Sequence, residues 1–271
     1  MIVLRSQREI EKIRSACLIV SEVLQRLRER VLPGVTTWEL NLLSESLAEK
    51  RKAKPAFKGY HGYPFALCTS VNEEVVHGMP SKKRHLKEGD IISIDFGVVY
   101  DGYYGDAAMT LPVGRIDEEA RRLCAVTEES LYEGIRQAVV GNRLSDISHA
   151  IQDYVEKRHY TVVREFVGHG IGQQLHESPQ IPNYGPPGKG VKLKEGMVFA
   201  IEPMINQGGP EVEILGDQWT AVTSDRKLSA HFEHTIAITR NGPDILTRHG
   251  SLGVFGQPSG ACNRDNQRLA H

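Results

Sequence analysis

The spacing of apolar residues predicts amphipathic helices at the start of the chain. Apolar positions three or four residues apart form one stripe: Ile10, Ile13, Cys17, Val20 and Leu24. Ser6 precedes this helix as its N-cap, and Glu9, three residues later, completes a capping box. Thr36 opens a second predicted helix, over 36–52, in the same way. The first fifty residues are therefore expected to form two helices joined by a turn that contains glycine.

Strands are predicted further along by a different pattern. Residues 91–100 and 197–205 are rich in β-branched and aromatic residues and are bounded by turns, and residues 230–239 alternate between apolar and polar. Each segment is expected to be one strand. Residues 248–271 contain four glycines, few apolar residues and no periodicity, so we expect them to form a flexible tail.

The chain also repeats itself at an offset of 107 residues. Residues 78–95 align without a gap on residues 185–202, and eight of these 18 positions are identical. The same offset relates the first helix to one predicted from about 117 to 139, and the second to one over 144–157. Two similar halves, about 1–110 and 111–247, are therefore expected. Helices on one face of two related, largely antiparallel sheets make this an α+β fold, a single domain over 1–247.

The repeat pairs two acidic residues, Asp95 and Glu202, that each end the apolar core of a predicted strand. A buried unpaired carboxylate is costly, and neither strand has a basic residue nearby to form a salt bridge. Asp106 and Glu233 follow these acids by 11 and 31 residues, which is consistent with neighbouring strands. A pseudo-two-fold axis would therefore bring four acids together between the halves.

Four carboxylates at one point require bound cations. His169, between two glycines, offers an imidazole, although a histidine in such a loop is often only a polar loop residue. Oxygen ligands with one imidazole favour Mn, Fe, Co or Zn over a thiolate-type site.

Composition narrows the class of protein. The 271 residues carry a formal net charge of −1, with 40% hydrophobic and 25% charged residues, so no overall field favours nucleic acid or membrane as a partner. The four cysteines show no CxxC pairing, which is typical of free thiols in a reducing compartment. No signal peptide and no run of 18 apolar residues is visible, so a cytoplasmic enzyme is expected.

Five long motifs, in order, resemble those of bacterial-type type I methionine aminopeptidases over about residues 1–247. They are GYHGYPFALCTSVNEEVVHGMP, IDFGVVYDGYYGDAAMT, EFVGHGIGQQLHESPQIPNYGPPG, GMVFAIEPMI and HFEHTIAIT. The resemblance implies the pita-bread fold, with pseudo-two-fold halves and a dinuclear metal site. It also implies removal of the N-terminal methionine from nascent proteins, with a preference for a small second residue.

Carried over to this sequence, the resemblance implies two divalent ions per chain (Co, Mn, Fe or Zn) and a monovalent cation nearby. Asp95 would chelate one divalent ion, and His169 and Glu202 the other. Asp106 and Glu233 would bridge both ions.

The same resemblance implies further roles. Glu202 would carry the proton between the attacking water and the leaving amine, while His77 and His176 would contact the peptide and stabilise the oxyanion. On the residues alone, loop packing is an equal alternative for either histidine. The methionine pocket would be lined by Phe57, Tyr60, Tyr63, Cys68, Leu175 and Trp219.

Related activities are less well supported by the sequence. Prolidase-type and Xaa-Pro aminopeptidases usually carry an additional N-terminal domain, and type II enzymes have a helical insertion for which the 31 residues from Glu202 to Glu233 leave no room. Binding modules that have lost the metal share the fold, but here all five ligands are present. We expect a monomer that acts on nascent chains, docks on the ribosome surface and has no membrane or specific nucleic-acid partner.

Overall fold

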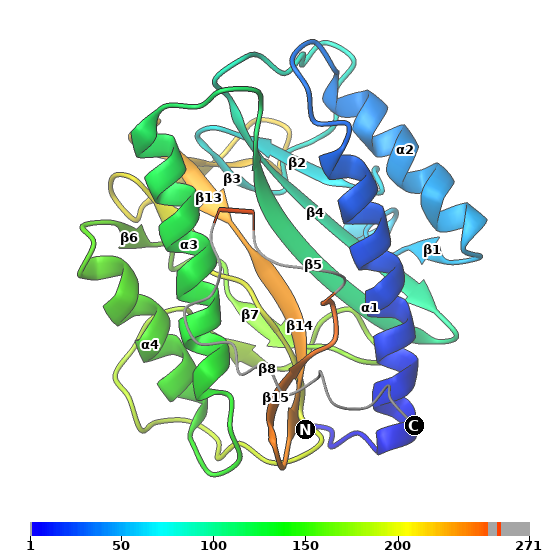
Figure 1. Ribbon diagram of the computed structural model, residues 1–271, viewed down its shortest axis with the longest axis vertical. Coiled ribbons are helices and arrows are strands. Elements are labelled where there is room, and N and C mark those ends of the chain that lie inside the picture. The colour runs from blue at the N-terminus through cyan, green and yellow to red at the C-terminus, as the bar shows by residue number, and fades with distance from the viewer. Residues whose placement is uncertain (1, 249–253, 256–271) are drawn as a thin grey trace, which may run out of the picture.

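The computed structural model describes residues 2–248 and 254–255 (Figure 1). This part of the chain contains four α-helices: α1 (Gln7–Arg28), α2 (Thr37–Lys50), α3 (Glu118–Gln137) and α4 (Leu144–Glu156). All four were predicted, with ends that differ by only a few residues. The capping box of Ser6 and Glu9 is present, and Thr36 caps α2 in the same way. Local sequence signals therefore set where these helices begin.

A short 3-10 helix, η1 (Tyr60–Gly62), and fifteen strands complete the described elements. The strands are β1 (Lys54–Pro55), β2 (Cys68–Val71), β3 (Glu74–Val76), β4 (Ile91–Tyr100), β5 (Tyr103–Pro112), β6 (Thr161–Val162), β7 (Gly168–Gly170), β8 (Glu177–Ile181), β9 (Val198–Ile201), β10 (Met204–Asn206), β11 (Val212–Ile214), β12 (Ala221–Thr223), β13 (Ser229–His231), β14 (Glu233–Thr239) and β15 (Gly242–Ile245).

One large antiparallel sheet spans both halves of the chain. Its order is β1-β4-β5-β14-β9-β7-β8, with β2 also paired to β4 and β15 to β14. Strand β5 of the first half pairs with β14 of the second, so the two expected sheets are continuous here. Helices α1 and α3 lie on the same side of this sheet, one on each side of the junction (Figure 1). Two three-stranded sheets, β13-β10-β6 and β11-β12-β3, lie beside the large one.

The 107-residue repeat is visible in equivalent turns. Gly34 and Gly141 both have positive φ, +91° and +102°, where a side chain would be strained. Their N–H groups donate to the carbonyl oxygens of Leu86 and Leu193, at 2.7 and 3.1 Å. All four positions obey the same offset, so the duplication predicted from sequence is also a duplication of backbone geometry.

Two predicted strands are each divided into two. Residues 197–205 form β9 and β10 with a break at Glu202 and Pro203, and residues 230–239 form β13 and β14 with a break at Phe232. Pro203 cannot donate a ladder hydrogen bond, and its carbonyl accepts the N–H of Phe232 at 3.4 Å. At both breaks the chain passes between the large sheet and a small one. Glu202 and Glu233 consequently lie at strand ends.

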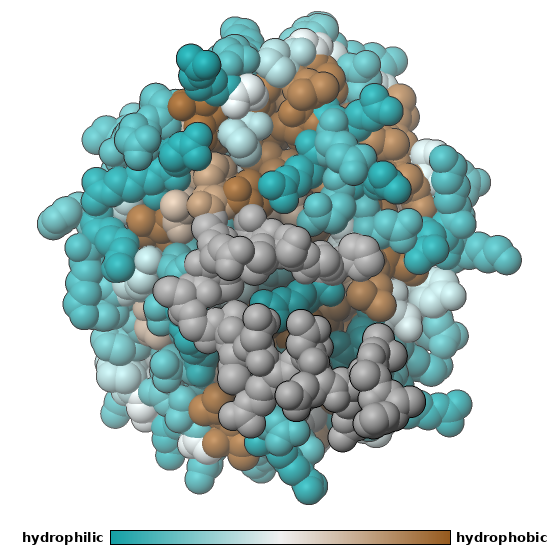
Figure 2. Space-filling view, in the orientation of Figure 1, coloured by the Kyte–Doolittle hydropathy of each residue, from teal (hydrophilic) through white to brown (hydrophobic). Residues whose placement is uncertain are grey.

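Each half has its own apolar core. Buried side chains of α1 and β4 form one cluster, and those of α3, α4 and β9 form the other. Mainly hydrophilic side chains cover the outer faces of the helices in Figure 2. No helix among the described residues is long and apolar enough to cross a membrane. Most of the predicted tail lies outside the described residues, but Val254 and Phe255 are described and are half-buried.

Candidate metal centre

A single pocket between the two halves brings together every site residue named from the sequence. It encloses about 520 Å³. Its thirteen lining residues are Phe57, Tyr60, Tyr63, Cys68, His77, Asp95, Asp106, His169, Leu175, His176, Glu202, Trp219 and Glu233.

Strand pairing places three acids on one face of the sheet. Ala108 of β5 lies opposite Asp95 of β4 on one side and opposite Glu233 of β14 on the other. Side chains that are directly opposite point to the same face, and so do residues two apart along a strand. Asp106, two residues before Ala108, therefore shares the face with Asp95 and Glu233. The small alanine between them leaves the carboxylates room to converge.

The second half supplies the remaining ligands by the same rule. Ala200 of β9 lies opposite His169 of β7 and opposite Thr235 of β14. Glu202 is two residues beyond Ala200, and its Oε1 lies 3.5 Å from His169 Nε2. The candidate ligand atoms of Asp106, His169 and Glu233 all lie within 4.8 Å of one another. The five predicted ligands thus point into one space.

A glycine on the neighbouring strand makes this convergence possible. Gly97 pairs with Asp106 across β4 and β5. A Cβ atom at position 97 would lie 3.0 Å from Asp106 Oδ1 and 3.0 Å from the Phe57 ring. The carboxylate and the aromatic wall of the pocket therefore need a residue without a side chain here.

The carboxylates are crowded, and several of their oxygens lack partners. Asp106 and Glu233 are only 3% and 2% exposed. Among the described residues, Asp95 Oδ1, Asp106 Oδ1 and Glu233 Oε1 are buried and have no hydrogen-bond partner. Burial raises the pKa of Asp95 to about 7, and burial together with like-charged neighbours raises the pKa values of Asp106 and Glu233 well above the usual range. Such oxygens suit divalent cations, which would supply the missing partners.

His169 is arranged as a neutral ligand. Its Nδ1 lies 2.9 Å from the carbonyl oxygen of Gly170, so Nδ1–H donates there and Nε2 keeps its lone pair. Burial lowers the pKa of His169 to about 3. The oriented, uncharged imidazole is the form in which histidine binds metals in proteins.

Two further histidines line the pocket in neutral form. His77 has a left-handed backbone, φ +61°, and burial lowers its pKa to about 4. Such a conformation is unusual outside glycine and is common at functional sites. His176 Nδ1 lies 2.8 Å from the Tyr60 hydroxyl, and the His176 ring centroid is 4.2 Å from that of His169. Both rings can therefore offer hydrogen bonds to a ligand beside the acids.

One part of the pocket is lined by aromatic and apolar side chains. Tyr63 and Trp219 meet edge to face at 5.1 Å, and the Tyr63 hydroxyl donates to the carbonyl oxygens of Leu67 and Gly78. Cys68, which pairs with Asp95, contributes a buried thiol whose pKa burial raises well above its usual value. This end of the pocket offers apolar contact close to the carboxylates.

One residue at the site was not found from the sequence. His231 is 1% exposed, and its Nε2 lies 3.7 Å from Glu202 Oε2 with no hydrogen-bond partner among the described residues. His231 stands two residues before Glu233, on the same face of an alternating segment. That alternation is the signal that could have identified it.

Comparisons with known proteins identify the family of this chain. The family model described as "Metallopeptidase family M24" matches residues 11–240. A methionine aminopeptidase of Clostridium acetobutylicum is 54% identical over 247 residues, which covers 91% of this chain and 99% of that protein. Methionine aminopeptidase 1 of Bacillus subtilis is 55% identical over 248 residues, with 92% and 100% covered.

Solved structures give the same picture. The crystal structure of a methionine aminopeptidase from Thermotoga maritima has a TM-score of 0.91 at 51% identity, covering 92% of this chain and all of that chain. A prolidase from Pyrococcus horikoshii has a TM-score of 0.75 at 25% identity, but only 64% of that longer chain is covered.

Proposed function

Since this chain belongs to metallopeptidase family M24, as a metal-dependent methionine aminopeptidase of the bacterial type I group with the pita-bread fold, we propose that it works with two divalent ions and prefers a small second residue. The substrates are then nascent proteins that begin with methionine. One observation carries the proposal for the metals: three buried carboxylate oxygens without partners lie beside a neutral imidazole.

The five ligands divide into three roles in this proposal. Asp95 would hold one ion, His169 and Glu202 would hold the other, and Asp106 and Glu233 would contribute to both. The buried, partnerless oxygens of Asp95, Asp106 and Glu233 support a metal site at these residues. A set of oxygens with one nitrogen suits Mn, Fe, Co or Zn, and we expect a monovalent cation nearby.

The residues around the ligands position the reacting groups. Bound divalent ions would lower the pKa of a water molecule and polarise the scissile carbonyl group. Glu202, whose carboxylate lies between His169 and His231, would take a proton from the attacking water and pass it to the leaving amine. His77 and His176 would donate hydrogen bonds to the carbonyl oxygen as negative charge develops there. The methionine side chain would occupy the apolar end, near Tyr63.

The preference for a small second residue rests on crowding beyond the scissile bond. The His77 ring packs edge to face against Phe166 at 5.3 Å, and both line the continuation of the site. A large side chain there would displace packed atoms at a cost of about 1–3 kcal/mol or more, equivalent to roughly ten- to a hundredfold in rate.

A series of Met-Xaa-Ser peptides tests this preference. We expect efficient cleavage when Xaa is Gly, Ala, Ser, Thr, Val, Pro or Cys, and poor cleavage with Leu, Phe, Lys or Glu, as compared by kcat/KM. Equal values for Met-Ala-Ser and Met-Phe-Ser would show that the space is open.

Calorimetric titration of the chelator-treated enzyme with Mn²⁺ tests the metal assignment. We expect two ions per chain for the wild type and weakened binding in Asp106→Asn. A stoichiometry of one, unchanged in that variant, would contradict the bridging role.

We further expect a cytoplasmic monomer that meets nascent chains at the ribosome surface. Light scattering measures its mass in solution.

A further inference from the structure

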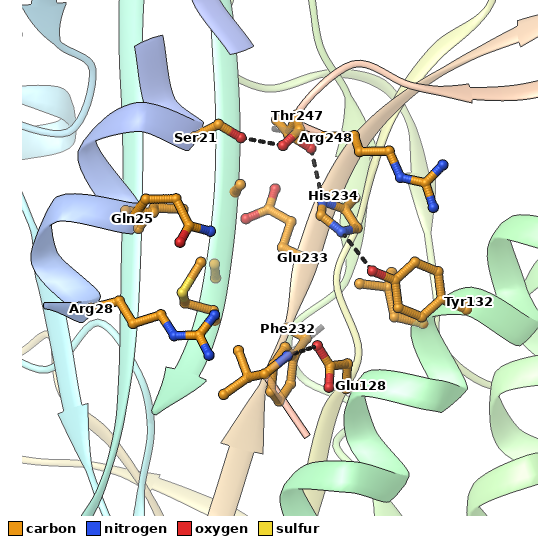
Figure 3. A pocket seen from close by; sticks show the side chains of 16 residues that line it. Ser21, Gln25, Arg28, Glu128, Tyr132, Phe232, Glu233, His234, Thr247 and Arg248 are labelled. Atoms are coloured by element: carbon orange, nitrogen blue, oxygen red, sulfur yellow. Dashed lines mark hydrogen bonds between the residues drawn. The ribbon is translucent and has the colours of Figure 1, made fainter. Parts of the chain in front are cut away.

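A second pocket lies behind the metal centre, on the helix side of the sheet (Figure 3). Ala107 of β5 and His234 of β14 are cross-strand partners and lie one residue away from metal-facing acids, so they point to this opposite side. Helix α1 forms one wall and helix α3 the other. The pocket therefore lies where the first half of the chain meets the second.

A chain of hydrogen bonds crosses one end of this pocket (Figure 3). The Ser21 hydroxyl of α1 donates to the carbonyl oxygen of Thr247. Thr247 Oγ1 lies 2.8 Å from His234 Nδ1, and the Tyr132 hydroxyl of α3 lies 3.3 Å from His234 Nε2. Thr247, two residues after the end of β15, thus connects both helices with β14.

Glu128 of α3 lies in the same pocket and is only 6% exposed. Its two carboxylate oxygens accept the backbone N–H groups of Val254 and Phe255, at 2.6 and 2.8 Å. Burial raises the pKa of Glu128, and these two hydrogen bonds lower it. Within residues 2–248 and 254–255, no other group donates a hydrogen bond to this carboxylate. A buried carboxylate is costly without such donors.

The side chains of the same dipeptide contact both halves of the molecule. Val254 packs against the apolar cluster of the first half and against that of the second. The Phe255 ring meets the ring of Phe232 at 6.4 Å, edge to face, and Phe232 directly precedes the metal-facing Glu233. This dipeptide lies beyond residue 240, where the match to the family model ends.

We propose that this pocket is a peptide-binding site whose ligand is the chain's own C-terminal segment at Val254 and Phe255. The recognised chemistry is an apolar dipeptide whose consecutive N–H groups bind one buried carboxylate, Glu128. By binding Glu128 of α3 and packing against the apolar clusters of both halves, the segment joins the two halves directly behind the strands that carry Asp106 and Glu233.

A double-mutant cycle on the metal-loaded enzyme tests this proposal. One change ends the chain after Arg248, and the other is Glu128→Gln. In the full-length chain, Glu128→Gln lowers the Tm by about 4–8 °C because hydrogen bonds to a charged acceptor are weakened. Truncation lowers the Tm to a similar extent. In the truncated chain, Glu128→Gln leaves the Tm unchanged or raises it, because an unpaired buried charge has been removed.

Two further variants sharpen the result. Glu129→Gln, in the next residue of the same helix, serves as the matched control. Glu129 forms a partly exposed ion pair with Arg136 and does not contact the C-terminal dipeptide, so the change should lower the Tm equally in both backgrounds. Val254→Asp places a second carboxylate beside Glu128 and should lower the Tm as truncation does, which tests the contact even if the truncated chain does not fold. An equal loss of Tm from Glu128→Gln in both backgrounds, or no loss from Val254→Asp, would overturn the proposal.

Discussion

Replacing Asp95 by asparagine should have opposite effects on stability with and without metal. Burial raises the pKa of Asp95 from its usual 3.8 to about 7, and its Oδ1 has no hydrogen-bond partner among the described residues. A carboxyl whose pKa is higher in the folded than in the unfolded chain destabilises the folded protein once it must ionise. Stability is therefore lost as the pH rises from about 4 through 7.

The size of the effect follows from the same shift. About three pKa units correspond to about 4 kcal/mol above pH 7 in the metal-free protein. Asparagine removes the charge but keeps the shape, so part of this cost is recovered. For a chain of this length, we expect the metal-free variant to melt about 5–10 °C above the metal-free wild type at pH 7.5. Near pH 4 the difference should shrink, because the wild-type carboxyl is then protonated.

Saturating Mn²⁺ should reverse the order of stability, so that the wild type melts at a higher temperature than Asp95→Asn. The wild type gains stability by binding metal to the folded state, whereas the variant lacks one ligand and gains less. Scanning calorimetry in chelator and in Mn²⁺, at pH 7.5 and 4.5, measures all four cases. Asp101→Asn is the control, because Asp101 is an exposed acid whose one ion pair within the described part of the chain is with Lys12. A metal-free Asp95→Asn protein that is less stable than wild type at both pH values would refute the reasoning.

Five further substitutions separate metal binding from catalysis. Asp106→Asn should lose metal and most activity, and circular dichroism should show that the fold is kept. Full activity with unchanged metal content would contradict the assignment of Asp106 as a metal ligand. His77→Ala or His176→Ala should lower kcat by about a hundred- to a thousandfold, as loss of an oxyanion donor does, with metal content near wild type; loss of metal instead would make that histidine a ligand. His231→Gln retains an N–H donor near Glu202 and should preserve most of kcat. His231→Leu should lower kcat more than it changes KM. Equal losses of kcat in the two variants would exclude a positioning role for His231.

Several features of the fold were predictable because their causes are local. Ser6 with Glu9 caps α1, and a glycine with positive φ is needed at Gly34 and again 107 residues later. The convergence of the acids was also predictable, since the internal repeat pairs Asp95 with Glu202, each after a run of apolar residues, and buried carboxylates that lie together require a cation. These inferences use only residues that are close together in the sequence or the internal repeat.

Other features depend on contacts between distant residues and could not be read from one sequence. The breaks in the strands at Glu202 and at Phe232 arise where the chain passes between sheets, and apolar residues continue on both sides of each break. The spacing of His231 from Glu233 is visible in the sequence, but its place beside Glu202 depends on the pairing of β13 with β10. In the sequence, Glu128 is one of several acidic residues in a predicted helix. Its role depends on Val254, 126 residues later, whose N–H group donates to the Glu128 carboxylate.

Peptide hydrolysis with metals supplied one at a time tests the central claim most directly. The chelator-treated enzyme would be given Mn²⁺, Fe²⁺, Co²⁺ or Zn²⁺ and assayed on Met-Ala-Ser, Leu-Ala-Ser and Ala-Pro-Ser. We predict no cleavage without metal and, with at least one of these ions, rapid cleavage of Met-Ala-Ser alone. Cleavage of Ala-Pro-Ser at a comparable rate, or undiminished cleavage of Met-Ala-Ser in chelator, would contradict the account.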